Sequence, residues 1–83
     1  MKANQEVFLK ELALIQDTAI IGHLDTGVPV EVLSSITFDT IAMVMELLDG
    51  YRDLDLKLID QADGSDLGED LELHDVIADF LKG

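Results

Sequence analysis

The sequence has 83 residues, enough for one hydrophobic core and too few for two, so a single domain over residues 1–83 is expected. Its 18 acidic residues against five Lys and Arg give a net charge of −13, which repels phosphate groups and argues against nucleic-acid and membrane partners. A hydrophobic content of 48% predicts a folded chain despite this charge, and the absence of cysteine excludes disulfides, thiolate catalysis and cysteine-bound metals.

The first predicted element is a long helix over about residues 5–23, with Asn4 as its N-cap. Its apolar residues recur at spacings of three and four, and they point in nearly every direction around the axis. Such a helix is buried on more than one side. Because so short a chain has little else to cover it, we expect a homodimer; complete wrapping by the later elements is the alternative. The residues expected at the dimer contact are Val7, Leu9, Leu14, Ile20 and Ile21.

Residues 28–33 alternate between apolar and other side chains and are rich in valine. Because of Pro29, this segment fits either a short edge strand or the first turn of a short helix. A second helix is predicted over about residues 37–49, and Gly50 should end it. The core stripe expected on that helix consists of Phe38, Ile41, Met45 and Leu48.

Leucines alternate with charged residues over about residues 54–59, which predicts a half-buried strand followed by an Asp-Gly turn. A helix with leucines four residues apart is the competing interpretation of this segment. A closing helix is predicted over about residues 70–82, just before Gly83. The predicted fold class is therefore α+β and predominantly helical, with an all-α four-helix bundle as the alternative.

Candidate sites for chemistry are weak. The acidic segment 60–70 resembles a calcium loop, but Ile59 and Gln61 would occupy ligand positions of an EF-hand, so no metal site is expected. The two histidines are His23, at the end of the first helix, and His74, four residues after Asp70. Both are explained as surface residues beside a carboxylate or a helix end.

The sequence also lacks the combinations of residues that enzymes need. It contains neither a nucleophile elbow nor a glycine-rich phosphate loop, and one Arg and four Lys leave little to bind an anionic substrate. We therefore expect no enzyme activity, no catalytic residue and no cofactor.

Size, acidity and helical content are similar to those of acyl carrier proteins, which carry phosphopantetheine on the serine of an Asp-Ser-Leu motif that opens a central helix. The nearest string here is Gly64-Ser65-Asp66-Leu67, in which the order is changed and which precedes the last predicted helix. This departure argues against modification of Ser65. Because size, acidity and helical content still match, a carrier or small-ligand-binding module is the alternative function.

Residues 37–81 resemble a group of small uncharacterised bacterial proteins. The strings that carry this resemblance are Thr37-Phe38-Asp39-Thr40-Ile41, Asp49-Gly50-Tyr51 and Glu72-Leu73-His74-Asp75. The resemblance implies a bacterial source and a shared fold, and it implies no activity and no functional residue.

The expected function is protein–protein interaction of the inhibitor, immunity or adaptor type, in which dispersed acids meet a basic protein partner. Because Glu6 precedes any apolar run, no secretory signal is recognised and a cytoplasmic location is expected. The acids expected to face a partner are Asp53, Asp55, Asp60, Asp63 and Asp66.

Overall fold

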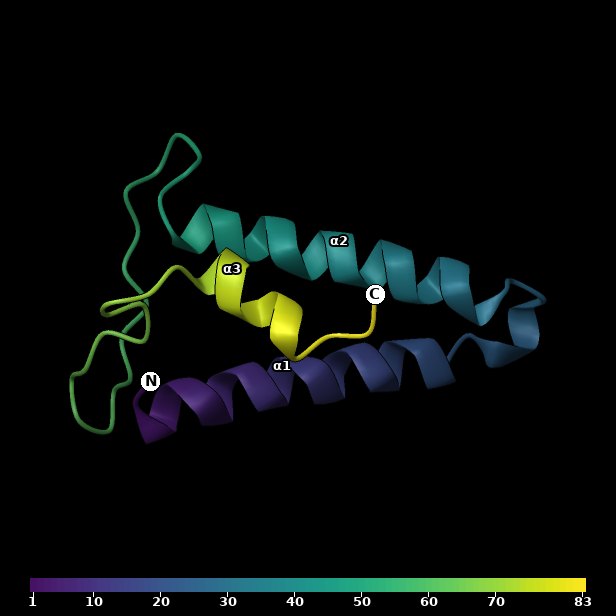
Figure 1. Cartoon of the computed structure of the whole chain (residues 1–83), viewed down its shortest axis with the longest axis horizontal. Helices are drawn as coiled ribbons and strands as arrows, with labels where there is room; N and C mark the ends of the chain where they lie inside the picture. The colour runs from purple at the N-terminus through teal and green to yellow at the C-terminus, as the bar shows by residue number, and fades with distance from the viewer.

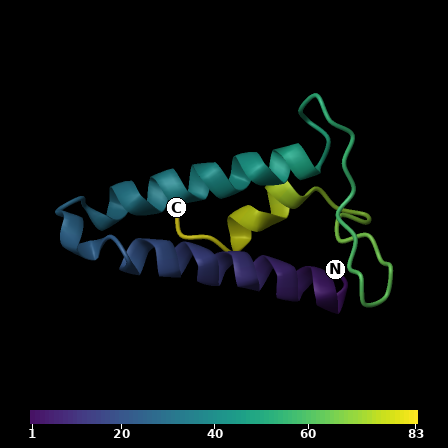
Figure 2. The same ribbon diagram turned by 180° about the vertical axis from the view of Figure 1, so that it is seen from behind.

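The computed structural model describes all 83 residues and contains helices only (Figures 1 and 2). Helices α1 (Ala3–Ile21) and α2 (Val30–Leu48) form an antiparallel hairpin, and the short 3₁₀ helix η1 (Leu24–Thr26) lies in their connection. A long loop then leads to the short helix α3 (Leu73–Val76), which continues into the 3₁₀ helix η2 (Ile77–Asp79). In Figure 1, α3 lies between the two long helices, and the loop and the N-terminus share the open end of the hairpin.

The connection between α1 and α2 explains where the chain turns and where α2 begins. Gly27 has φ 81°, a left-handed conformation that glycine adopts at little cost, and it turns the chain back toward α1. Pro29 follows and precedes the first turn of α2, where a missing N–H costs nothing because no helical hydrogen bond would use it. The possible strand at 28–33 is therefore wrong, and the helical alternative is right in kind, although the helix begins at Val30 and is the long α2, not a short one.

The predicted α+β class is also wrong, because residues 54–59 form no strand. They run as extended loop without a partner strand, and the only β-type pairing is an isolated bridge between Ile59 and Asp66. An isolated extended segment cannot form the ladder that stabilises a sheet. Of the alternating leucines, only Leu58 packs against the core, while Leu54 and Leu56 are exposed. The all-α alternative gives the right class, although the chain has two long helices and one short one where four were expected.

Each of the three predicted helices has different boundaries in the structure. The helix predicted over 5–23 is α1, and its N-cap is Lys2, because the Asn4 side chain is used elsewhere. The helix predicted over 37–49 begins as early as Val30. The helix predicted over 70–82 shrinks to α3 and η2, since Asp70 has φ 61°, which no helix accommodates.

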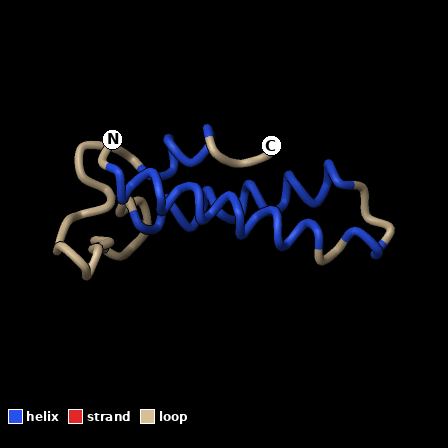
Figure 3. Tube along the Cα trace, turned by 90° about the horizontal axis from the view of Figure 1, so that it is seen from below, coloured by secondary structure: helices blue, strands red, loops and turns tan.

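The core is small and lies at the open end of the hairpin. Its fully buried cluster joins Leu9 of α1, Met45 of α2, Leu73 of α3 and Ile77 of η2. Only nine of the 83 residues are buried, and three of these are polar. Seen from the side, α3 and the C-terminal tail lie on one face of the α1–α2 pair, and no helix covers the opposite face (Figure 3). None of the helices combines the length and the apolar character needed to cross a bilayer.

Candidate functional site

Ionisable side chains gather where α2 ends and α3 begins. The Asp49 carboxylate accepts hydrogen bonds from the backbone N–H groups of Leu73, at 2.9 Å, and of His74, at 2.8 Å. It also lies 2.7 Å from Nδ1 of the His74 ring. The Asp49 side chain is only 6% exposed, so these bonds compensate a carboxylate that has lost most of its hydration. Asp49 therefore caps α3 from the end of a different helix.

Tyr51, Glu72 and Asp75 surround this pair. The Tyr51 hydroxyl donates a hydrogen bond to Glu72, and its ring packs at a tilt against His74 with the ring centroids 4.7 Å apart. The hydrogen bond to Asp49 raises the pKa of His74, and the negative charges of Asp75, Asp49 and Glu72 add to this effect. The hydrogen bond to Glu72 raises the pKa of Tyr51 to about 12. His74 is thus tethered chiefly to Asp49, which is distant in sequence, and not to Asp70.

The cluster contains atoms that could bind a metal ion, but those of Asp49 are already used in hydrogen bonds. Ligand atoms of Asp49, Glu72 and His74 lie within 4.8 Å of one another, a nitrogen and oxygen set that zinc accepts. Asp49, however, already accepts two backbone N–H groups and contacts the His74 ring. A metal ion would have to displace part of the cap of α3, so we assign this cluster the role of joining α2 to α3.

A pocket of about 460 Å³ opens beside the cluster, between the end of α2 and the loop. Its lining includes the carboxylates of Asp49, Asp55, Asp66 and Glu72, with Lys57 as the only cation. Such a lining repels anionic ligands, including the phosphate of a phosphopantetheine group.

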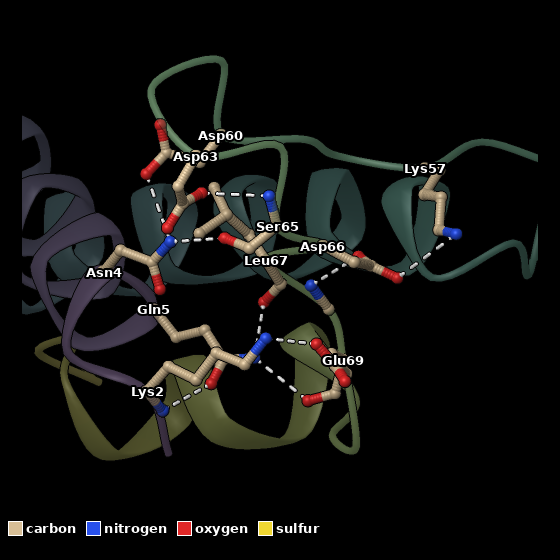
Figure 4. A network of polar contacts seen from close by, with 11 residues as sticks. Lys2, Asn4, Gln5, Lys57, Asp60, Asp63, Ser65, Asp66, Leu67 and Glu69 are labelled. Atoms are coloured by element: carbon tan, nitrogen blue, oxygen red, sulfur yellow. Dashed lines mark hydrogen bonds and ion pairs between the residues drawn. The ribbon is translucent and has the colours of Figure 1, made fainter.

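The acidic loop is shaped by its own carboxylates (Figure 4). Asp60 accepts a hydrogen bond from the backbone N–H of Ala62, and Asp63 and Asp66 likewise accept one from the residue two positions further on. These are three successive turns in which an aspartate replaces a backbone acceptor. The hydrogen bonds to Ser65 lower the pKa of Asp63. The spacing of these aspartates therefore serves the geometry of the loop.

The first turn of α1 holds this loop in place (Figure 4). The Asn4 side chain donates to Asp60 at 3.1 Å and to Ser65 Oγ at 2.7 Å. The buried Gln5 side chain donates to the backbone carbonyls of Leu67 and Glu69. Because its hydroxyl is engaged by Asn4, Ser65 is a structural residue of the loop in this conformation.

The predicted partner-facing acids fall into two groups. Asp53, Asp55 and Asp63 are exposed, whereas Asp60 and Asp66 are half-buried. Asp60, Asp63 and Asp66 all accept backbone hydrogen bonds within the loop. The predicted dimer residues divide as well. Leu9 lies in the core and Ile20 is buried against the hairpin, so neither is available to a second copy. The remaining residues, Val7, Leu14 and Ile21, are exposed along the outer edge of α1.

Two buried glutamines of α1 are structural residues that the apolar pattern does not predict. Gln5 and Gln16 are almost completely buried, and the Gln16 side chain pairs with both backbone polar groups of Lys82. Their signal was available, because Gln5, Leu9, Gln16 and Ile20 are spaced by four, seven and four residues and share one helix face.

Comparisons of the chain with protein-family models, with characterised proteins and with solved structures found no match. The resemblance of residues 37–81 to small bacterial proteins therefore remains an expectation.

Proposed function

We propose that this chain is a non-enzymatic interaction module of the inhibitor, immunity or adaptor type, whose acidic end binds a basic surface of another protein in the cytoplasm. The observation that carries the proposal is the segregation of charge along the molecule. Residues 49–79 contain eleven of the 18 acidic residues but only Arg52 and Lys57 as cations. Residues 18–36, around the turn of the hairpin, contain only Asp25 and Glu31.

This segregation gives the molecule one strongly negative end. The acidic segment forms the loop at the open end of the hairpin and the short helices that run inward from it between α1 and α2 (Figure 1). A concentrated negative field accelerates encounter with a positive partner and selects against negative ones. The turns at Asp60, Asp63 and Asp66 also fix the backbone of the loop. Less conformational freedom is then lost when a partner binds.

A non-enzymatic role agrees with the hydrogen bonds of the two side chains that could act in catalysis, His74 and Ser65. The Nδ1 atom of His74 is held by Asp49, and Ser65 Oγ accepts a hydrogen bond from Asn4. These two side chains belong to different clusters and do not form a nucleophile with its base.

The proposal is tested by charge reversal at the exposed loop acids. The purified chain is immobilised, and proteins retained from a lysate of its host are compared for the wild type, Asp53→Lys/Asp55→Lys and Glu31→Lys/Asp25→Lys. We expect a specific basic protein to be retained at about 0.05 M salt, released at about 0.5 M salt and lost with the first variant only, since screening weakens exposed charge pairs. Both variants change the net charge equally, so equal loss with the control pair would reject docking at the acidic end.

We also propose that the module is a homodimer. The support is the amount of apolar surface that a single copy leaves uncovered: sixteen large hydrophobic residues are exposed. Contiguous exposed apolar surface is a mark of interaction sites.

A further inference from the structure

We propose that two copies pack face to face through the side of the α1–α2 layer that α3 leaves uncovered, forming a four-helix core. This inference rests on the proposed self-association and names its surface. The covered side is marked by Asp17 of α1, which pairs with Lys82 of the C-terminal tail, and by Asp49 of α2, which caps α3. The opposite side of the layer has no helix on it (Figure 3).

Counted at about 100° per residue, each long helix carries an uncharged and mostly apolar stripe turned away from Asp17 on α1 and from Asp49 on α2. The positions follow one another at spacings of three and four residues, the pattern of a helix face that packs on other helices. On α1 the stripe consists of Phe8, Leu12, Ile15 and Ala19, and on α2 of Val30, Leu33, Thr37, Ile41, Val44 and Leu48. None of these residues is charged, although charged residues make up 28% of the chain.

The stripe is only partly used by the single copy. Phe8, Leu12, Ile41 and Leu48 touch the core cluster but are not fully buried. Ile15 is 57% exposed and Val44 is 45% exposed. The side chains on this face therefore reach from the core of one copy to its surface, where a second layer can complete their burial.

The size of the uncovered surface suits a second copy. The chain exposes 5415 Å², whereas a compact protein of its mass exposes about 4,900 Å². Two helices of this length, each about 28 Å long and about 10 Å wide, present on the order of 600 Å² in projection, close to the roughly 800 Å² per partner in a standard interface. A homodimer with two-fold symmetry uses the same patch on both copies, so one face of this extent is sufficient.

Charge favours one orientation of the two copies. Two copies of net charge −13 repel each other, and stripes that carry no charged side chain of their own lower this cost, although Arg52 and Asp53 of the loop lie beside Val44 at the edge of the face. With two-fold symmetry, two hairpins packed through these faces can run either parallel or antiparallel to each other. In the antiparallel pair, the acidic end of each copy lies over residues 18–36 of the other, which carry only Asp25 and Glu31. We therefore expect the antiparallel arrangement.

The test compares glutamate substitutions at neighbouring positions with matched exposure. Ile15 and Leu14 are 57% and 56% exposed, and Val44 and Met43 are 45% and 47% exposed, but only Ile15 and Val44 belong to the stripes. Ile15→Glu and Val44→Glu should weaken dimerisation at least tenfold by light scattering or sedimentation, whereas Leu14→Glu and Met43→Glu should remain dimers. Helical circular dichroism confirms that each variant is folded.

Several outcomes would overturn this interface. A monomeric wild type at high protein concentration rejects it without any variant. Dissociation caused by Leu14→Glu or Met43→Glu places the contact on the outer edges of the hairpin. Salt separates this proposal from the docking of a basic partner, because screening strengthens the association of two negative copies and weakens docking. A monomer that still captures a basic protein would therefore reject the dimer and leave the docking function standing.

Discussion

Asp49 and His74 are held together at two points, since the Asp49 carboxylate binds both the backbone N–H and the ring nitrogen of His74. The pair joins the end of α2 to the start of α3. Replacing Asp49 with alanine should lower the free energy of unfolding by about 2 kcal/mol, because the start of α3 loses its cap and two N–H groups lose their acceptor. Urea unfolding followed by circular dichroism measures this, and Asp53→Ala, at an exposed loop position, should change stability by less than about 0.5 kcal/mol.

Stability should depend on pH through His74. The folded state binds the imidazole proton more tightly than the unfolded state, whose pKa is near 6.5, because of the hydrogen bond to Asp49 and the nearby acids. The proton therefore stabilises the fold fully below pH 6.5, and this contribution is lost as the pH rises through the raised pKa of the folded state. Between about pH 6 and about pH 8, the wild type should lose more stability than His74→Gln. Parallel curves for the two proteins would contradict the pairing, since repulsion among the other acids changes equally in both.

The pKa of Tyr51 can be measured directly and reports on the same cluster. It is the only tyrosine in a chain without tryptophan, so the absorbance of the ionised phenol reports on Tyr51 alone. Its pKa should be about 12 in the folded protein, and Glu72→Gln should shift it toward the ordinary value of 10.0. A wild-type titration centred at the ordinary value would show that the hydrogen bond from Tyr51 to Glu72 does not persist in solution.

Gln16 should control the C-terminal tail. Its amide donates to the carbonyl of Lys82 at 2.7 Å and accepts from the N–H of Lys82 at 2.8 Å. Gln16→Leu keeps a buried side chain of similar size but removes these two bonds together with those to Ser34 and Thr37, at an expected cost of about 1–3 kcal/mol. Hydrogen exchange at the Lys82 amide should accelerate in the variant, and the exposed Gln61→Leu should leave it unchanged.

The sequence predicts α1 to within two residues at each end, because the apolar spacing of three and four follows from helix geometry. It predicts α2 only from residue 37, since the alternating valines after Pro29 also fit a strand. It fails at residues 54–59, where leucine alternation is typical of a strand but no second strand exists to pair with. It also overextends the last helix, because the left-handed conformation of Asp70 depends on the loop that precedes it.

The candidate site was harder to predict than the fold. Asp49 and His74 are 25 residues apart in sequence, so their pairing depends on how α3 docks against α2. The five acids expected to face a partner were chosen by charge alone, which cannot separate the exposed Asp53 from Asp60, whose carboxylate binds Asn4. For α1, the sequence predicted apolar side chains around nearly the whole axis, but the division between core and surface required the position of α3.

The two buried glutamines of α1 have a consequence for folding. Both bind the backbone of residues 50–83, and this segment contains little regular structure of its own. Residues 50–83 therefore resemble a tethered peptide ligand whose receptor is the α1–α2 hairpin, with buried amides as the recognition groups. The covalent connection supplies the high effective concentration that keeps such a ligand bound. Opening of this segment should accordingly form its own cooperative unit, in which the amides of α3 exchange together while the hairpin stays intact.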